Sequence, residues 1–305
     1  MTPFRFATQA RTAADARQWR EKARKAEELG YSSLLVPDHL NDHWAPLVSL
    51  TIAAEATSTL KVGSLMFNNE YRHPLLLARE FAMLADACEG RVEFGIGAGW
   101  KDEDFTHLGL PFDAPGVRIG RLAESVRILK QFWSGGEVDF SGRHYTVRAA
   151  PGQPFAKVPL MLGGGGRRML TLAAREADIV GFNATAASGT VDADMIRSMT
   201  AGSYAERVGW VREAAGERFA GLELQCLTPI CQLVPDRAET IENIAKYSAL
   251  TPEEIAESPA FLIGSAEEIC ETLEERREKF GFTYWVLPEA EMERFAPIVE
   301  RLTGR

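Results

Sequence analysis

The feature that most constrains the fold is a regular alternation between short apolar segments and longer amphipathic ones. A short apolar run predicts a buried strand, whereas apolar residues that recur every three or four positions predict a helix. Strands are expected at residues 4–7, 33–36, 61–67, 91–97, 159–162, 178–182, 222–234 and 283–287, each followed by a helical segment. Eight strand–helix pairs with short links predict a parallel sheet of the α/β class. They fit a closed (β/α)8 TIM barrel better than an open sheet.

Residues 1–305 are expected to form a single domain, because no linker or low-complexity tract divides the chain and such a barrel needs about 250 residues. Residues 134–147 interrupt the repeat with two short alternating segments around Ser141 and Gly142. This pattern predicts a small surface hairpin. The expected architecture is therefore a TIM barrel with insertions at its C-terminal mouth.

The charge balance excludes two classes of partner. Lys and Arg total 34 against 43 Asp and Glu, which gives a formal charge of −9. An acidic chain is a poor match for nucleic acid or for an anionic membrane, since both are bound through clustered positive charge. No apolar stretch approaches the roughly 18 residues of a membrane helix, and no secretory signal is visible, so a cytoplasmic location is expected. The four cysteines show no Cys-x-x-Cys spacing, which predicts buried free thiols in a reducing compartment.

Chemistry in such a barrel is expected at the C-terminal ends of the strands. Residues 37–44 follow the second strand and contain two imidazoles, two carboxylates and an indole. His39 and Trp44 are the favoured functional residues, because imidazole titrates near neutrality and can exchange protons. Asp42 and His43 are interpreted as solvated loop residues. His39 and His43 could share a metal ion only if the segment were helical, since their spacing is i, i+4.

Two further strand ends carry weaker signals. The loop at residues 64–74 is rich in aromatic and amide groups, which suits either a flat ligand or ordinary packing. Gly95, Gly97 and Gly99 precede Trp100 after the fourth strand. Alternate glycines allow the backbone to approach a ligand or a neighbouring helix, and they do not complete a dinucleotide-binding motif.

The sharpest signal is a run of four glycines, Gly163 to Gly166, between an apolar strand and a helix. Backbone N–H groups at a helix N-terminus suit a phosphate, and Arg167 and Arg168 could add charge-assisted contacts. The alternative is a structural turn, which would need only one or two glycines. A phosphate here suggests an extended ligand whose reactive ring lies over the centre of the barrel.

Six segments together resemble a known family. They are residues 33–39, 72–74, 90–100, 163–170, 177–181 and 263–265. The chain resembles bacterial luciferase-like oxidoreductases, and more narrowly the branch that uses the deazaflavin coenzyme F-420 (F420). The resemblance covers residues 4 to about 302. It discriminates less well between FMN and coenzyme F420.

The resemblance implies an isoalloxazine-type ring at the barrel mouth, with His39 as the catalytic residue beside the reactive carbon of the ring. It implies a non-proline cis peptide at Ser64–Leu65 and a homodimer, and it implies no metal ligand. Phe182, Asn183 and Ala184 would border the phosphate-side tail. The cofactor-binding residues expected on this basis are Asp38, His39, Ser64, Leu65, Gly97, Ala98, Gly163, Gly164, Gly165, Gly166, Arg167, Arg168, Phe182 and Asn183. The expected substrate-binding residues are Trp44, Phe67, Asn68, Tyr71 and Trp100.

The sequence departs from the sugar-phosphate dehydrogenases of this family. Trp100 occupies the position where they carry a proton-donating carboxylate after the glycines of the fourth strand. A second acidic residue is absent from residues 8–12, and the lysines that clamp the sugar phosphate have no clear match after Gly181. These differences, together with the aromatic side chains of Trp44, Phe67, Tyr71 and Trp100, point to a more apolar substrate.

The favoured function is hydride transfer between coenzyme F420 and a small, fairly apolar organic substrate. The first alternative is an FMN-dependent monooxygenase that uses reduced flavin and oxygen. The others are a flavin-binding barrel without turnover and a metal-dependent hydrolase built on His39 and His43.

Overall fold

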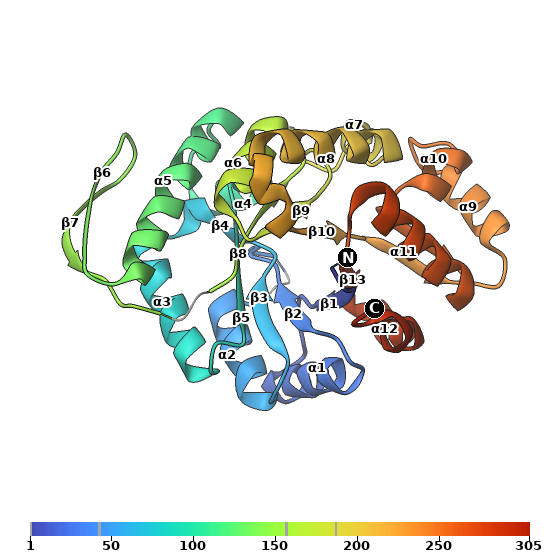
Figure 1. The fold of residues 1–305 in the computed structure, drawn as a ribbon, viewed down its shortest axis with the longest axis horizontal. Helices are drawn as coiled ribbons and strands as arrows, with labels where there is room; N and C mark the ends of the chain where they lie inside the picture. Colours follow the sequence, from blue (N-terminus) through green and yellow to red (C-terminus); the bar gives the residue numbers. More distant parts are fainter. Residues whose placement is uncertain (1, 42–43, 156–157, 187) are drawn as a thin grey trace.

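The computed structural model describes residues 2–41, 44–155, 158–186 and 188–305. Eight parallel strands close into a barrel, as the alternation predicts (Figure 1). Around the barrel they follow the order β3-β2-β1-β13-β10-β9-β8-β5, and β5 pairs with β3 to close the sheet. The strands are β1 (Arg5–Gln9), β2 (Ser33–Val36), β3 (Lys61–Ser64), β5 (Val92–Gly97), β8 (Leu160–Gly164), β9 (Ile179–Phe182), β10 (Glu223–Leu227) and β13 (Tyr284–Pro288).

Each barrel strand is followed by a helix of the outer ring. These helices are α1 (Ala16–Glu28), α2 (Pro46–Ala56), α3 (Pro74–Ala87), α5 (Pro115–Ser134), α6 (Arg167–Glu176), α8 (Ala201–Ala215), α11 (Ala266–Phe280) and α12 (Ala296–Leu302). Their starts follow local chemistry. Proline stands in the first turn of α2, α3 and α5, where its missing N–H costs nothing, and Ser265 caps α11 together with Glu268.

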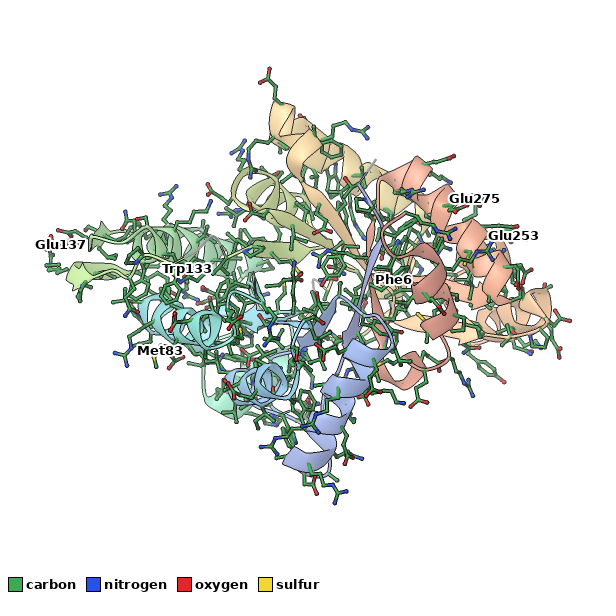
Figure 2. All side chains as sticks on the ribbon, turned by 60° about the horizontal axis from the view of Figure 1, so that its bottom comes forward. Phe6, Met83, Trp133, Glu137, Glu253 and Glu275 are labelled. Atoms are coloured by element: carbon green, nitrogen blue, oxygen red, sulfur yellow. The ribbon has the colours of Figure 1, made fainter. Side chains whose placement is uncertain are left out.

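The core has two layers because successive strand residues point to opposite faces of the sheet. In β1, Phe6 packs in the outer layer between strands and helices, whereas Ala7 points into the barrel. Phe6 of β1 is labelled in Figure 2. The interior layer is apolar and contains Ala7, Leu35, Leu65, Met161, Ile179, Tyr284 and Val286.

A charged cluster fills the N-terminal end of the barrel. The Glu93 carboxylate is fully buried and accepts hydrogen bonds from Arg5, Ser33 and Tyr284. Arg5 also forms a bidentate ion pair with Glu223, at 2.5 and 2.6 Å. Because the charges are paired and hydrogen-bonded, the cost of burying them is offset.

One predicted strand is shorter than expected. The segment 222–234 divides into β10 and β11 (Ile230–Leu233), and Pro229 lies between them. Proline cannot donate a ladder hydrogen bond, so the barrel strand ends before it. β11 leaves the barrel and pairs in parallel with β12 (Phe261–Gly264). The segment 61–67 likewise divides into β3 and the short strand β4 (Phe67–Asn68).

Several short elements are inserted between the barrel strands and the outer helices. They include η1 (Asn69–Tyr71), α4 (Asp102–Leu108), α7 (Ala193–Arg197), η2 (Gly216–Gly221), α9 (Arg237–Ala245), α10 (Pro252–Glu257) and η3 (Glu289–Glu291). The predicted hairpin is present as antiparallel β6 (Glu137–Ser141) and β7 (Thr146–Pro151), and it lies beside α5 (Figure 1). Figure 2 shows Glu137, the first residue of β6, at the outer margin of the molecule. Within the described residues, no helix is both long and apolar enough to span a bilayer.

Candidate active site

His39 directly follows the Pro37–Asp38 pair at the end of β2, at the C-terminal mouth. Its Nδ1 lies 2.6 Å from Oδ2 of Asp104, and its side chain is 23% exposed. The ring of Trp100 meets the imidazole edge-on, with centroids 5.6 Å apart. The structure therefore brings His39 and Trp100 together, as expected, and adds Asp104.

Asp104 was not predicted from the sequence. It lies on α4, an insertion after β5, and its carboxylate is only 1% exposed. The adjacent Phe105 is fully buried and packs its ring near those of Tyr71 and Phe112, which anchors α4 at the mouth. Burial, together with the negative charge of Asp104, raises the pKa of the Tyr71 hydroxyl. Tyr71 therefore belongs to the same cluster as His39.

Asp38 joins the loop after β2 to the loop after β3 through hydrogen bonds. Its Oδ2 accepts hydrogen bonds from Arg72 at 2.6 Å and from the Asn68 amide at 3.0 Å, and its Oδ1 accepts from Arg72 at 3.2 Å. The Asn68 side chain caps η1 by accepting from the Glu70 amide. Both oxygens of Asp38 thus hold the loop after β3 against the end of β2, and its expected contact with the cofactor remains a prediction.

A non-proline cis peptide is present between Leu65 and Met66, one bond later than the resemblance implies. The hydroxyl of Ser64 donates to the Gly95 carbonyl at 2.6 Å, and the Gln9 amide donates to the Leu65 carbonyl at 3.2 Å. A Cβ on Gly95 would lie 2.0 Å from the Ser64 carbonyl oxygen. Glycine is therefore required in β5 where it meets the end of β3.

The four-glycine turn divides into two parts. A Cβ on Gly163 would lie 2.5 Å from the Gly181 carbonyl oxygen, and one on Gly165 would lie 2.6 Å from Oγ1 of Thr185. Close packing on β9 and its loop explains these two glycines. Gly166 is different: it is the N-cap of α6, and its Cβ would meet no atom within 4 Å. This open position is the part of the turn that can face a ligand.

The two arginines after the turn are directed to neighbouring helices. Arg167 is exposed and pairs with Glu213 of α8 at 3.1 Å. Arg168 reaches α5, because a Cβ on Gly116 would lie 2.7 Å from its Nη1. The expected contact of these two guanidinium groups with a cofactor phosphate stays a prediction.

A different arginine approaches the turn from α8. Arg207 is buried, and burial lowers the pKa of its guanidinium. It donates to the Asn183 carbonyl at 3.2 Å, to Oγ1 of Thr185 at 3.1 Å and to the Ser198 carbonyl at 2.6 Å. Thr185, Ser198 and Arg207 itself line a hollow of about 400 Å³ beside Gly165. Nothing in the sequence marked Arg207, because its partners come from two separate segments, the loop after β9 and the end of α7.

Two side chains, one after β9 and one in the middle of β10, have buried polar atoms that lack hydrogen-bond partners. Oδ1 of Asn183 is one, and both amide atoms of Gln225 in β10 are the others. Gln225 lies against Gly181, whose Cβ would be 2.8 Å from its Oε1. Buried groups of this kind are usually satisfied by water or a ligand.

Two expected aromatic residues occupy other places, and a third contacts a helix of the outer ring. Phe67 is fully buried between Phe81 and Phe94, and Phe182 is fully buried against Phe282. Both face the outer layer because they alternate with inward-facing residues, so their side chains do not line the mouth. The Trp44 ring stacks on Trp19 of α1, and its place over the substrate stays a prediction.

The metal alternative depends on residues 42–43, which lie outside the described residues. Among the residues that are described, no group of three or more potential ligands gathers as a metal site.

Comparison with known proteins places the chain in a family. Residues 1–215 match the model of the luciferase-like monooxygenase family. The chain belongs to this family. The luciferase-like chain is 34% identical over 178 residues to the F420-dependent glucose-6-phosphate dehydrogenase of Kineococcus radiotolerans, which covers 54% of the chain and 51% of that relative. The chain spans about half the length of this relative and of a second one, the F420-dependent glucose-6-phosphate dehydrogenase of Microbacterium testaceum.

Solved structures confirm the barrel fold of the luciferase-like chain. A coenzyme F420-dependent tetrahydromethanopterin reductase from Methanopyrus kandleri aligns with a TM-score of 0.78 and 20% identity, covering 98% of this chain and 99% of that one. An F420-dependent secondary alcohol dehydrogenase, solved with an F420–acetone adduct, aligns with a TM-score of 0.80 and 18% identity, covering 99% of both chains. At these identities the likeness establishes the fold.

Proposed function

We propose that this chain is an oxidoreductase that transfers a hydride between coenzyme F420 and a small, fairly apolar organic substrate. The observation that carries the proposal is the His39–Asp104 pair, whose imidazole meets the Trp100 ring edge-on at the same mouth as the open Gly166 turn. The F420-dependent relatives support this choice of coenzyme. The family description as monooxygenases keeps an FMN-dependent monooxygenase as the alternative.

The residues present fit a phosphate-bearing cofactor. No side chain caps the first turn of α6, so its N–H groups and the positive end of the helix dipole are available to a phosphate at Gly166. Oδ1 of Asn183, an acceptor without a partner, suits a hydroxyl of the cofactor tail. Gly97 ends β5 and Ala98 follows it, and these small residues allow a planar ring to approach the backbone.

When bound, the coenzyme supplies a ring carbon that accepts or releases a hydride. His39 handles the proton that accompanies this transfer, since imidazole accepts and donates protons near neutral pH. Trp100 and Tyr71 flank the imidazole cluster with apolar surface, which limits the access of water.

The substrate proposal rests on the departures around the mouth. The curated relatives are named for glucose 6-phosphate, whereas here Trp100 stands next to the catalytic imidazole. An indole favours apolar contact and cannot donate a proton as a carboxylic acid does. Because Phe67 lies in the core, the aromatic residues proposed to contact the substrate are Trp44, Tyr71 and Trp100.

A homodimer in the cytoplasm completes the proposal. Three large apolar side chains are more than half exposed on the neighbouring helices α2 and α3: Val48, Leu76 and Met83. Figure 2 shows Met83 at the surface of α3. Exposed apolar side chains of this kind favour a protein interface. All four cysteines are buried free thiols, which suits a reducing compartment. Sedimentation analysis checks the dimer.

The experiment is a pair of titrations of the apo protein, one with coenzyme F420 and one with FMN, followed by the fluorescence of the ring. We expect saturable binding of coenzyme F420 and, without oxygen, its turnover with small alcohols or carbonyl compounds. Saturable binding of FMN alone, with oxygen consumption after reduction, overturns the proposal in favour of the monooxygenase.

A further inference from the structure

The carboxylate of Asp104 is placed to control the imidazole of His39. Asp104 is almost completely buried, whereas His39 is partly exposed, and their facing atoms are 2.6 Å apart. An ionised carboxylate can only accept hydrogen bonds, so Nδ1 must carry the proton in this contact. A hydrogen bond with one ionised partner is short and strong compared with a neutral one.

The surroundings hold Asp104 in this position. Its other oxygen lies 3.4 Å from the Leu40 amide and 3.9 Å from Nζ of Lys101, whose ammonium pairs more closely with Glu103 at 2.5 Å. The first turn of α4 is fixed by the Asp102 amide, which donates to the Gly189 carbonyl at 3.2 Å. The buried Phe105 ring anchors the same turn. The carboxylate therefore belongs to a packed element and not to a solvated loop tip.

We propose that Asp104 is a positioning residue that fixes the Nδ1–H tautomer of His39, which makes Nε2 the atom that exchanges a proton with the substrate. This proposal rests on the proposed function. In the oxidative direction the substrate C–H bond breaks and its hydride, a proton with two electrons, goes to the coenzyme. The hydroxyl proton of the same substrate goes to Nε2, and a carbonyl remains. In the reverse reaction the hydride returns to the carbonyl carbon and the proton returns from Nε2 to the oxygen.

The charge of Asp104 adds a second effect. When Nε2 takes the proton, the ring becomes an imidazolium, and the adjacent carboxylate stabilises that cation. Asp104 itself touches no reacting atom. In this chain the carboxylate thus lies on the Nδ1 side of His39. The position directly after the β5 glycines is occupied by Trp100, which has no carboxylate.

The test compares Asp104→Asn with Glu103→Gln. Asparagine matches the shape of aspartate but can donate to Nδ1 and removes the charge. Glu103 lies on the same turn, is mostly exposed and pairs with Lys101, so its variant is the matched control. Nitrogen-15 NMR of the free protein reports the tautomer of His39, whose signal is assigned among five histidines with His39→Ala.

We expect the wild-type imidazole to carry its proton on Nδ1 and Asp104→Asn to shift it toward Nε2. Turnover of coenzyme F420 should fall by about 10²- to 10⁴-fold in kcat with its affinity within about threefold, as for loss of an acid–base group. Glu103→Gln should behave as wild type. An Nε2–H tautomer in the wild-type protein overturns the proposal even if Asp104→Asn does not fold, and so does a folded Asp104→Asn variant with unchanged tautomer and kcat. Wild-type protein with the Nδ1–H tautomer but no F420 turnover instead refutes the proposed function.

Discussion

Substituting Gly166 tests the phosphate site without disturbing the fold. Gly166 has φ −96° and ψ 148°, an extended conformation that aspartate and asparagine adopt without strain, and its Cβ position is open. Both residues are favoured N-caps, so either variant should keep or slightly raise stability. The two variants differ only in charge, which makes Gly166→Asn the matched control for Gly166→Asp.

The expected effect follows from Coulomb's law. Two like charges about 5 Å apart repel by about 3 kcal/mol at an effective dielectric constant near 20, and by about 1 kcal/mol in bulk water. Gly166→Asp should therefore bind coenzyme F420 about fivefold to about 150-fold more weakly than Gly166→Asn. Fluorescence titration measures both dissociation constants, and the gap should narrow as salt is added.

Two results would refute this reasoning. Equal affinities of the aspartate and asparagine variants at low salt would show that no phosphate lies at the turn. A loss of thermal stability in Gly166→Asp would show that α6 does not begin as the structure has it.

Three further predictions follow from other parts of the molecule. His39→Ala should lower kcat by about 10²- to 10⁴-fold and leave F420 affinity within about threefold, and equal loss of both would contradict its role. Tyr284→Phe removes a 2.7 Å hydrogen bond to the buried Glu93 carboxylate and should cost about 1.5–3 kcal/mol in denaturant unfolding, whereas an unchanged midpoint argues against the cluster. Although desolvation opposes it, backbone N–H groups of Thr59 and its two neighbours lower the pKa of Glu27 from 4.5 to about 2. Its contribution to stability is thus present above pH about 4.5 and lost as the pH falls toward about 2. Glu27→Gln should cost about 1–2 kcal/mol at pH 7, and the cost should shrink over that acid range; a pH-independent cost contradicts it.

The barrel could be predicted from the sequence because the spacing of apolar residues in each of the eight strand–helix pairs indicates which segments are buried. Local signals also explain where the prediction was too simple. Pro229 ends β10 and releases β11 to pair with β12, although the apolar pattern continues through it. The apolar pattern alone does not reveal such a change of partner, because it indicates burial and not the strand with which a segment pairs.

The site was predicted less completely because side-chain direction and distant contacts are not local properties. His39 and Trp100 could be placed at the mouth from their positions after strands. Phe67 and Phe182 face outward, and their direction depends on a strand register that a short apolar run does not fix. Asp104 lies 65 residues from His39 on an unpredicted helix, so only the folded chain brings the two together.

A crystal structure of the protein with coenzyme F420 tests the central claim most directly. We predict the phosphate at the N-terminus of α6, on the open side of Gly166, and the ring beside the imidazole of His39. A ring bound elsewhere, or N–H groups of residues 164–167 that point into packed protein, would contradict this account.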